Sequence, residues 1–128
     1  MTGAVTLGLC AALAAALAGG CGDRATETAP KPSATRQLRE RGALALSAYG
    51  CGSCHHIPGI RGADGIVGPP LVDLGRRVYI GRGMPNTPQN MARWIRTPQQ
   101  FAPGSAMPDM QVSAAHAQAI TAYLLQRD

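Results

Sequence analysis

The chain has 128 residues and a formal net charge of +5, from 12 Lys and Arg against 7 Asp and Glu. One Trp, one Phe and three Tyr leave little aromatic bulk for the core of so small a domain, and such domains are often completed by a disulfide, a metal or a cofactor. The basic residues are scattered and few aromatics are free to stack on bases, which argues against nucleic acid as a partner.

Residues 1–21 are predicted to be a signal peptide or an N-terminal membrane anchor. Gly3 to Gly20 carry no charge and are rich in Ala and Leu, a length that suits a signal peptide or a short span. Small residues precede Cys21, an arrangement that resembles a bacterial lipoprotein signal with a lipid on the cysteine. A lipid on Cys21, an uncleaved anchor and a soluble product remain open alternatives. In each case we expect the rest of the chain on the periplasmic side of a bacterial membrane, anchored or secreted.

Residues 22–35 are predicted to be a flexible tether, because they are polar, contain two prolines and have no apolar period. Residues 36–128 then form one domain. Its first predicted helix has one apolar face, made by Leu38, Gly42, Ala45, Leu46 and Tyr49 at helical spacing. Glycine is unfavourable inside a helix, so the glycine of this face is expected to mark the close approach of another helix.

The helix leads directly into Cys51-Gly52-Ser53-Cys54-His55, which has the C-x-x-C-H spacing of c-type haem attachment. The thiols of Cys51 and Cys54 are expected to bond to the two haem vinyl groups, and His55 to ligate the iron. A redox-active disulfide fits less well, because the βαβ setting is absent. A zinc site with His56 also fits less well, because a second cysteine pair is absent and adjacent histidines rarely reach one ion. We therefore predict one covalent haem c containing iron.

Two further helices are predicted after the motif. One begins at Thr87-Pro88 and ends before Pro98, with Met91 in the core. The other has Ser113 as its N-cap. Its apolar stripe comprises Val112, Ala115, Ala119, Ile120, Tyr123 and Leu124. No alternating pattern of a strand stands out, so the predicted fold class is all-α.

A methionine is expected to complete the iron coordination, as is common in cytochromes c. Met107 lies in FAPGSAMP, where two prolines and a glycine oppose regular structure and favour an extended loop. Met107 is our choice of sixth ligand, with Met110 and Met84 as the alternatives.

Taken in this order, residues from about Gln37 to Arg127 resemble the class I monohaem cytochromes c. More narrowly they are similar to small membrane-associated bacterial cytochromes c and to the cytochrome c domains of haem-copper oxidases. The resemblance implies three to four helices wrapped around one covalent haem, with the first and last helices crossing where Gly42 gives Tyr123 room. It also implies that the carbonyl of Pro69, in Gly68-Pro69-Pro70-Leu71, accepts a hydrogen bond from His55. From its place in the sequence, Trp94 is expected to be a core residue that contacts the haem, with an indole hydrogen bond to a haem propionate or to the ligand loop as the alternative.

The resemblance implies an electron carrier and not an enzyme, and no catalytic residue is expected. The expected partners are redox proteins such as a haem-copper oxidase or a periplasmic dehydrogenase. A haem enzyme or gas-binding cytochrome with an open sixth position is the alternative, and an assembly module with a vestigial haem is a third.

Overall fold

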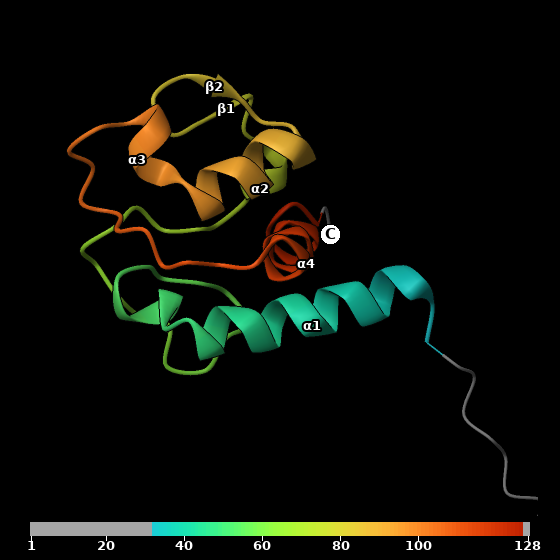
Figure 1. Ribbon diagram of the computed structural model, residues 1–128. Coiled ribbons are helices and arrows are strands. Elements are labelled where there is room, and N and C mark those ends of the chain that lie inside the picture. Colours follow the sequence, from blue (N-terminus) through green and yellow to red (C-terminus); the bar gives the residue numbers. More distant parts are fainter. Residues whose placement is uncertain (1–31, 127–128) are drawn as a thin grey trace, which may run out of the picture. The chain divides into compact units, whose positions relative to one another are not determined.

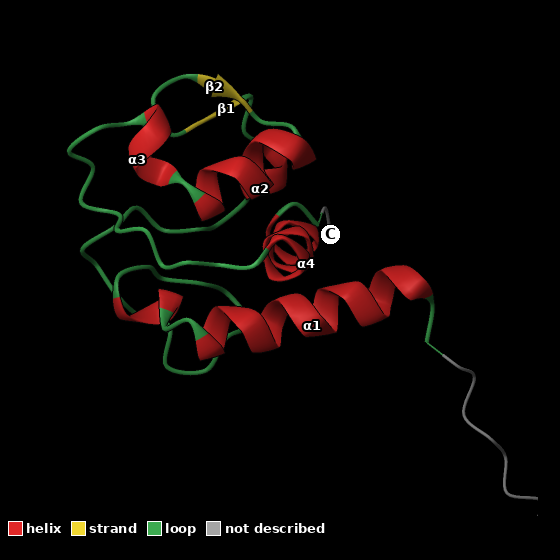
Figure 2. Cartoon of the chain, in the orientation of Figure 1, coloured by secondary structure: helices red, strands yellow, loops and turns green. Residues whose placement is uncertain are grey.

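The computed structural model describes residues 32–126, which contain four α-helices, two short 3₁₀ turns and one small hairpin (Figures 1 and 2). The predicted signal or anchor and most of the predicted tether lie outside these residues. Among the residues described, no helix is both long enough and apolar enough to span a membrane. The mostly helical architecture confirms the predicted all-α class.

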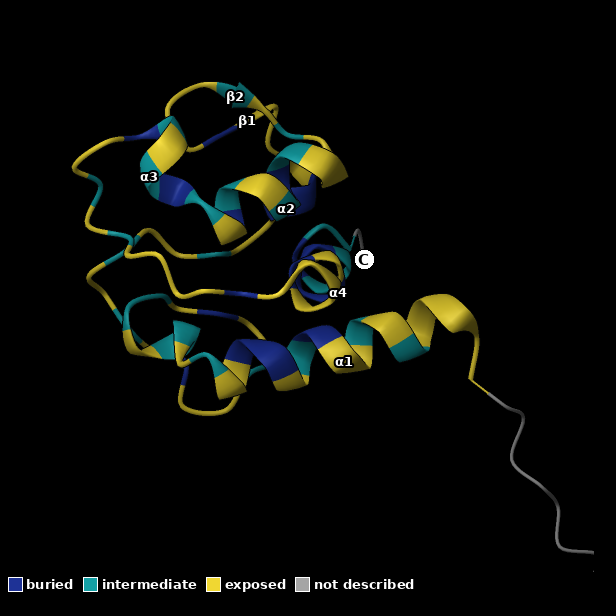
Figure 3. Cartoon of the chain, viewed as in Figure 1, coloured by how far each residue is buried: buried dark blue, intermediate teal, exposed yellow. Residues whose placement is uncertain are grey.

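Helix α1 (Ala34–Ala48) starts earlier than the sequence suggested. The side chain of Ser33 caps it by accepting a hydrogen bond from the N–H of Arg36, at 3.2 Å. The helix therefore begins inside the range predicted to be tether. Its first turns are exposed (Figure 3), and Leu38, which we expected on the buried face, is 37% exposed. An apolar periodicity cannot detect a polar first turn, so the serine N-cap is the one local signal for the start of this helix.

Helix α4 (Ala114–Leu124) crosses α1 and is seen end-on beside it in Figure 1. A Cβ on Gly42 would meet the backbone carbonyl of Ala119 and lie 3.0 Å from the Cβ of Tyr123, which confirms the predicted crossing. One position of the predicted stripe is wrong, because Ala115 is exposed and Ala117 is fully buried. The reason is that α4 contacts both α1 and α2, so the packing against two helices, and not one stripe, determines which positions are buried.

Helix α2 (Pro88–Arg96) begins and ends as predicted. The hydroxyl of Thr87 accepts from the N–H of Asn90 at 3.1 Å, and the helix stops before Pro98. The short helix α3 (Pro98–Phe101) follows at once. Strands β1 (Tyr79–Ile80) and β2 (Met84–Pro85) pair in an antiparallel hairpin that we did not predict, since two-residue strands are too short to show alternation.

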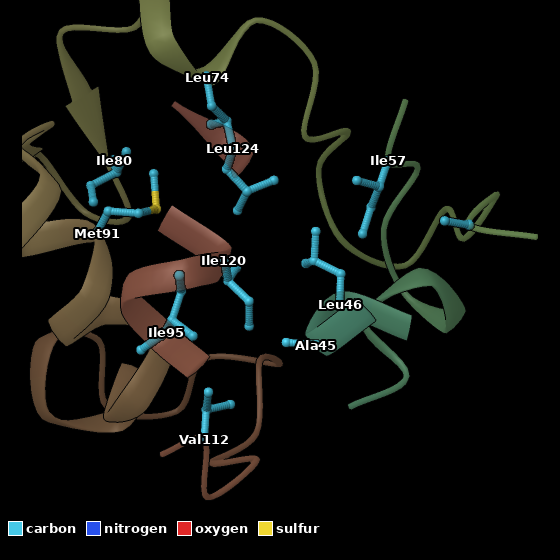
Figure 4. Close-up of a cluster of buried hydrophobic side chains, with 12 residues drawn as sticks. Ala45, Leu46, Ile57, Leu74, Ile80, Met91, Ile95, Val112, Ile120 and Leu124 are labelled. Carbon is cyan, nitrogen blue, oxygen red and sulfur yellow. The ribbon is translucent and has the colours of Figure 1, made fainter. Parts of the chain in front are cut away.

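Small aliphatic side chains fill the space where α1, α2 and α4 meet (Figure 4). Met91, expected in the core, is 3% exposed. The other labelled members are Ala45, Leu46, Ile57, Leu74, Ile80, Ile95, Val112, Ile120 and Leu124. This core fixes the end of α1, which carries the cysteine motif, and the end of α2, which leads to Met107.

Candidate functional site

The cysteine motif lies directly after α1, on a single 3₁₀ turn. Gly50 ends the helix in the left-handed region, at φ +67°, a conformation that glycine adopts without steric cost. The 3₁₀ turn η1 (Cys51–Ser53) follows, and the N–H of Cys54 donates to the carbonyl of Cys51 at 3.3 Å. Residues three apart eclipse one another in such a turn, so the side chains of Cys51 and Cys54 project to the same side.

Both thiols are half-buried and free of disulfide bonds. Burial is the main cause that raises the pKa of the Cys51 thiol, and the neighbouring Cys54 adds to the effect. The Cys51 sulfur is therefore favoured in an uncharged form. This environment suits a thioether, which carries no charge, better than it suits a thiolate.

His55 is held in one orientation by the segment that returns over the motif. Its Nδ1 lies 2.7 Å from the carbonyl oxygen of Pro69. Because a carbonyl only accepts, Nδ1 carries a proton and donates it, and Nε2 is the ring nitrogen that this hydrogen bond does not use. The backbone N–H of Gly68 donates to the carbonyl of Cys54 at 2.7 Å, and a Cβ on Gly68 would meet the imidazole ring. The ring therefore packs directly against a glycine backbone, with Nε2 available to a metal.

The loop between the motif and Pro69 is tied to the motif by its backbone. The N–H of Gly65 donates to the carbonyl of Gly52 at 3.0 Å, and the N–H of Leu71 donates to the carbonyl of His56 at 2.9 Å. The side chain of His56 pairs with Asp64, with 3.5 Å between Nδ1 and Oδ1. Residues 32–126 contain no cluster of three His, Cys, Asp or Glu side chains placed to hold a metal ion among themselves.

The three candidate methionine ligands lie in different surroundings. Met107 is half-buried in the loop after α3, and its N–H donates to the hydroxyl of Ser105 at 3.2 Å. Met110 is 39% exposed. Met84 lies on β2 and packs against the hydrophobic core. Trp94, on α2, is half-buried against the same core.

Two residues organise the segments around the site through contacts that we did not predict. The guanidinium of Arg77 donates to the carbonyls of Pro70 and Val72, at 2.9 and 3.1 Å, and so fixes the chain that follows Pro69. The side-chain amide of Gln99 bonds to the Met107 loop, with one of its bonds to the carbonyl of Met107 at 2.7 Å. Neither residue belongs to a periodic pattern or a short motif, so no local signal in the sequence indicates either role.

A family model for cytochrome c matches residues 39–128. The chain belongs to the cytochrome c family. It is also 31% identical over 91 residues to cytochrome c oxidase subunit 2 of Alkalihalophilus pseudofirmus. That match covers 70% of this chain and 26% of the oxidase subunit, so the chain spans about a quarter of the length of this relative. The resemblance to class I cytochromes c and the predicted cytochrome c fold are thereby confirmed.

Cytochromes c carry a covalently bound haem with iron and use it for electron transfer, so the cofactor prediction is confirmed with the family. The residues of this cytochrome c fit such a group. Two thiols project to one side of a turn, and the adjacent imidazole has its Nδ1 occupied and its Nε2 available. Because position 68 is a glycine, the imidazole ring of His55 packs directly on the backbone there.

Proposed function

We propose that this cytochrome c is an electron carrier whose haem would be attached through Cys51 and Cys54, with His55 and Met107 as the residues that would ligate the iron. The observation that carries the proposal is the 2.7 Å hydrogen bond between His55 Nδ1 and the carbonyl of Pro69. Such a bond fixes the imidazole orientation and raises the basicity of the ligating nitrogen. When bound, the haem supplies the one-electron chemistry of its iron.

In this proposal, the hydrogen bonds around the site keep its geometry unchanged during electron transfer. Cys51 and Cys54 are held on one turn by backbone hydrogen bonds, and the Met107 loop is bonded to α3. A thioether ligand favours the reduced iron and a higher potential. Trp94, half-buried on α2, would contribute an apolar contact with the haem. If His55 and Met107 both ligate the iron, no coordination position would be left for a substrate, which favours electron transfer over catalysis.

The partners in this proposal are redox proteins, namely a haem-copper oxidase or a periplasmic dehydrogenase. The similarity to a protein named cytochrome c oxidase subunit 2 supports the first of these. Residues 1–21 act as a signal peptide or membrane anchor, with a lipid on Cys21 in the lipoprotein form. Residues 22–33 connect that segment to the haem domain on the periplasmic side. Docking is weak and transient, as suits a carrier that must leave its partner.

The test of the ligand set is Met107→Ala in the matured holoprotein, with Met110→Ala and Met84→Ala as matched controls. Met107→Ala should abolish the weak near-infrared sulfur-to-iron band of the ferric protein, lower the reduction potential and allow carbon monoxide to bind promptly to the reduced protein. The controls should keep the band and stay closed to carbon monoxide. Loss of the band in a control variant instead would transfer the ligand role to that residue.

Carbon monoxide also separates the carrier from the alternative function. The reduced wild-type protein should show no prompt spectral change, because His55 and Met107 would both ligate the iron and leave no position open. A prompt change in the wild-type protein would contradict the closed site and support a haem enzyme or gas-binding cytochrome.

A further inference from the structure

The short helix α3 gives Gln99 a fixed base beside the Met107 loop. Pro98, the first residue of α3, is fully buried, and Ala102, just after it, is 3% exposed. The ring of Phe101 is covered by the guanidinium of Arg93 from α2, with 5.0 Å between the guanidinium carbon and the ring centroid. Helix α3 is therefore anchored on both sides of Gln99, and the backbone of that residue has little freedom to move.

The side-chain amide of Gln99 makes three hydrogen bonds to the loop. Its Nε2 donates to the carbonyl of Ser105 at 2.9 Å and to the carbonyl of Met107 at 2.7 Å. Its Oε1 accepts from the N–H of Gly104 at 3.1 Å. Two acceptors on one end and one donor on the other define the orientation of the amide, and both Nε2 hydrogens are used. One side chain thus holds the backbone on both sides of Ser105.

Few other contacts hold this loop within the described residues. Pro103, Gly104, Ala106 and Pro108 are exposed. The remaining hydrogen bonds are from the N–H of Ser105 to the carbonyl of Ala102 at 3.0 Å, and from the N–H of Met107 to the Ser105 hydroxyl at 3.2 Å. A loop with so little buried surface is expected to open easily once its hydrogen bonds are lost.

We propose that Gln99 is a positioning residue that holds the Met107 thioether on the iron. Its three hydrogen bonds fix the backbone from Gly104 to Met107 and so limit the excursions in which another ligand replaces the sulfur. The proposal rests on Met107 being the sixth ligand, as proposed above. Gln99 itself touches neither the haem nor the iron in this role.

Gln99→Glu and Gln99→Leu in the holoprotein test the proposal. Glutamate has almost the same size, but it replaces the two Nε2 donors with a carboxylate oxygen that faces two carbonyl oxygens. Leucine removes all three hydrogen bonds. Gln100→Leu is the matched control, since Gln100 is the exposed next residue of α3.

Two measurements test the iron ligand and the loop separately. Imidazole should bind the ferric Gln99 variants about tenfold to a hundredfold more tightly than the wild type, as expected for the loss of two or three hydrogen bonds that hold the competing ligand. In Gln99→Leu the amide hydrogen of Gly104 should exchange with solvent about tenfold faster, because its acceptor is gone. Gln100→Leu should match the wild type in both measurements.

Unchanged imidazole affinity in Gln99→Glu would overturn the proposal, because the volume of the side chain, and not its hydrogen bonds, would then account for its effect on the loop. Faster Gly104 exchange in Gln99→Leu with unchanged imidazole affinity would also overturn it, because the loop would be ordered without any effect on the ligand. Met107→Ala is measured in parallel. If that variant also binds imidazole no more tightly than the wild type, the ligand assignment itself fails. If only Met107→Ala binds imidazole more tightly, the ligand assignment stands and the proposed role of Gln99 is wrong.

Discussion

Gly68 permits the close approach between the imidazole of His55 and the segment that carries Pro69. A Cβ at this position would overlap the ring, at its Cε1 and at both nitrogens. Gly68→Ala should therefore push the ring away from the Pro69 carbonyl, at a cost of about 1–3 kcal/mol typical of overpacking. We expect a lower yield of holoprotein and a shifted reduction potential, measured by Soret absorbance per protein and by potentiometric titration.

Ile66→Ala is the control for Gly68→Ala, because the Ile66 side chain lies two residues away and is 93% exposed. It should leave both the holoprotein yield and the potential close to those of the wild type. A normal yield and potential in Gly68→Ala would show that the His55 ring tolerates displacement, and the hydrogen bond to Pro69 would lose its proposed importance.

At the scale of single residues, the sequence predicted what lies in short motifs and missed what depends on distant contacts. Cys51, Cys54 and His55 are candidate haem-binding residues by their spacing alone. The partner of His55 came only from the family resemblance, because it lies 14 residues away. Gln99 and Arg77 could not be found, since each acts through backbone carbonyls brought near by the fold and no spacing rule encodes such partners.

At the scale of helices, the crossing of α1 and α4 depends on Gly42. In an exposed helix, Gly→Ala would stabilise by up to about 1 kcal/mol through helix propensity. Here the new Cβ would meet the carbonyl of Ala119, so Gly42→Ala should lower the free energy of unfolding by about 1–3 kcal/mol. Denaturant titration of the holoprotein measures the change.

The sign of this change is decisive, because helix propensity and the crossing predict opposite effects. Leu44→Ala, at a 72% exposed position two residues along α1, should change the stability by less than about 0.5 kcal/mol. A stabilised Gly42→Ala would mean that α1 and α4 can separate at little cost.

A hydrogen bond also connects α4 to the loop after the cysteine motif. The hydroxyl of Tyr123 donates to the carbonyl of Pro58 at 2.7 Å. Tyr123→Phe keeps the ring and removes this bond, so the free energy of unfolding should fall by about 1 kcal/mol. Tyr79→Phe is the matched control, since Tyr79 is 61% exposed and should lose almost nothing. Equal changes in the free energy of unfolding in the two variants would mean that the Tyr123 hydroxyl contributes nothing specific to the attachment of α4 to this loop.

Helix starts and ends were predicted well where they carry local signals. Thr87 and Ser113 both cap helices, as their positions suggested. The pattern failed where tertiary contacts decide burial. Ala115 and Ala117 are chemically identical, and only the packing of α4 between two helices determines which one is buried. The same limit applies to the β1–β2 hairpin, whose strands are stabilised by their surroundings and not by a pattern of their own.

At the scale of the molecule, the charge of the described residues is positive and unevenly distributed along the chain. Residues 32–126 contain nine arginines and four acidic residues, which gives 9 − 4 = +5. Between Leu74 and Pro108 there are five arginines and no Asp or Glu. Two haem propionates would offset about two of these charges, so the loaded domain stays positive. Such a field attracts anions and acidic protein surfaces and repels cations.

This field makes opposite predictions for small redox reagents of opposite charge. Raising the ionic strength from about 0.01 to about 0.1 M shortens the Debye length from about 30 to about 10 Å. The rate of oxidation by anionic ferricyanide should therefore fall, and the rate with a cationic cobalt complex should rise. Arg82 lies on the exposed turn of the hairpin. Arg82→Glu should reduce the dependence of both rates on ionic strength, because it lowers the net charge by two units. Slopes of the same sign with both reagents would mean that the net positive field does not govern encounter, and an acidic partner surface would lose its electrostatic basis.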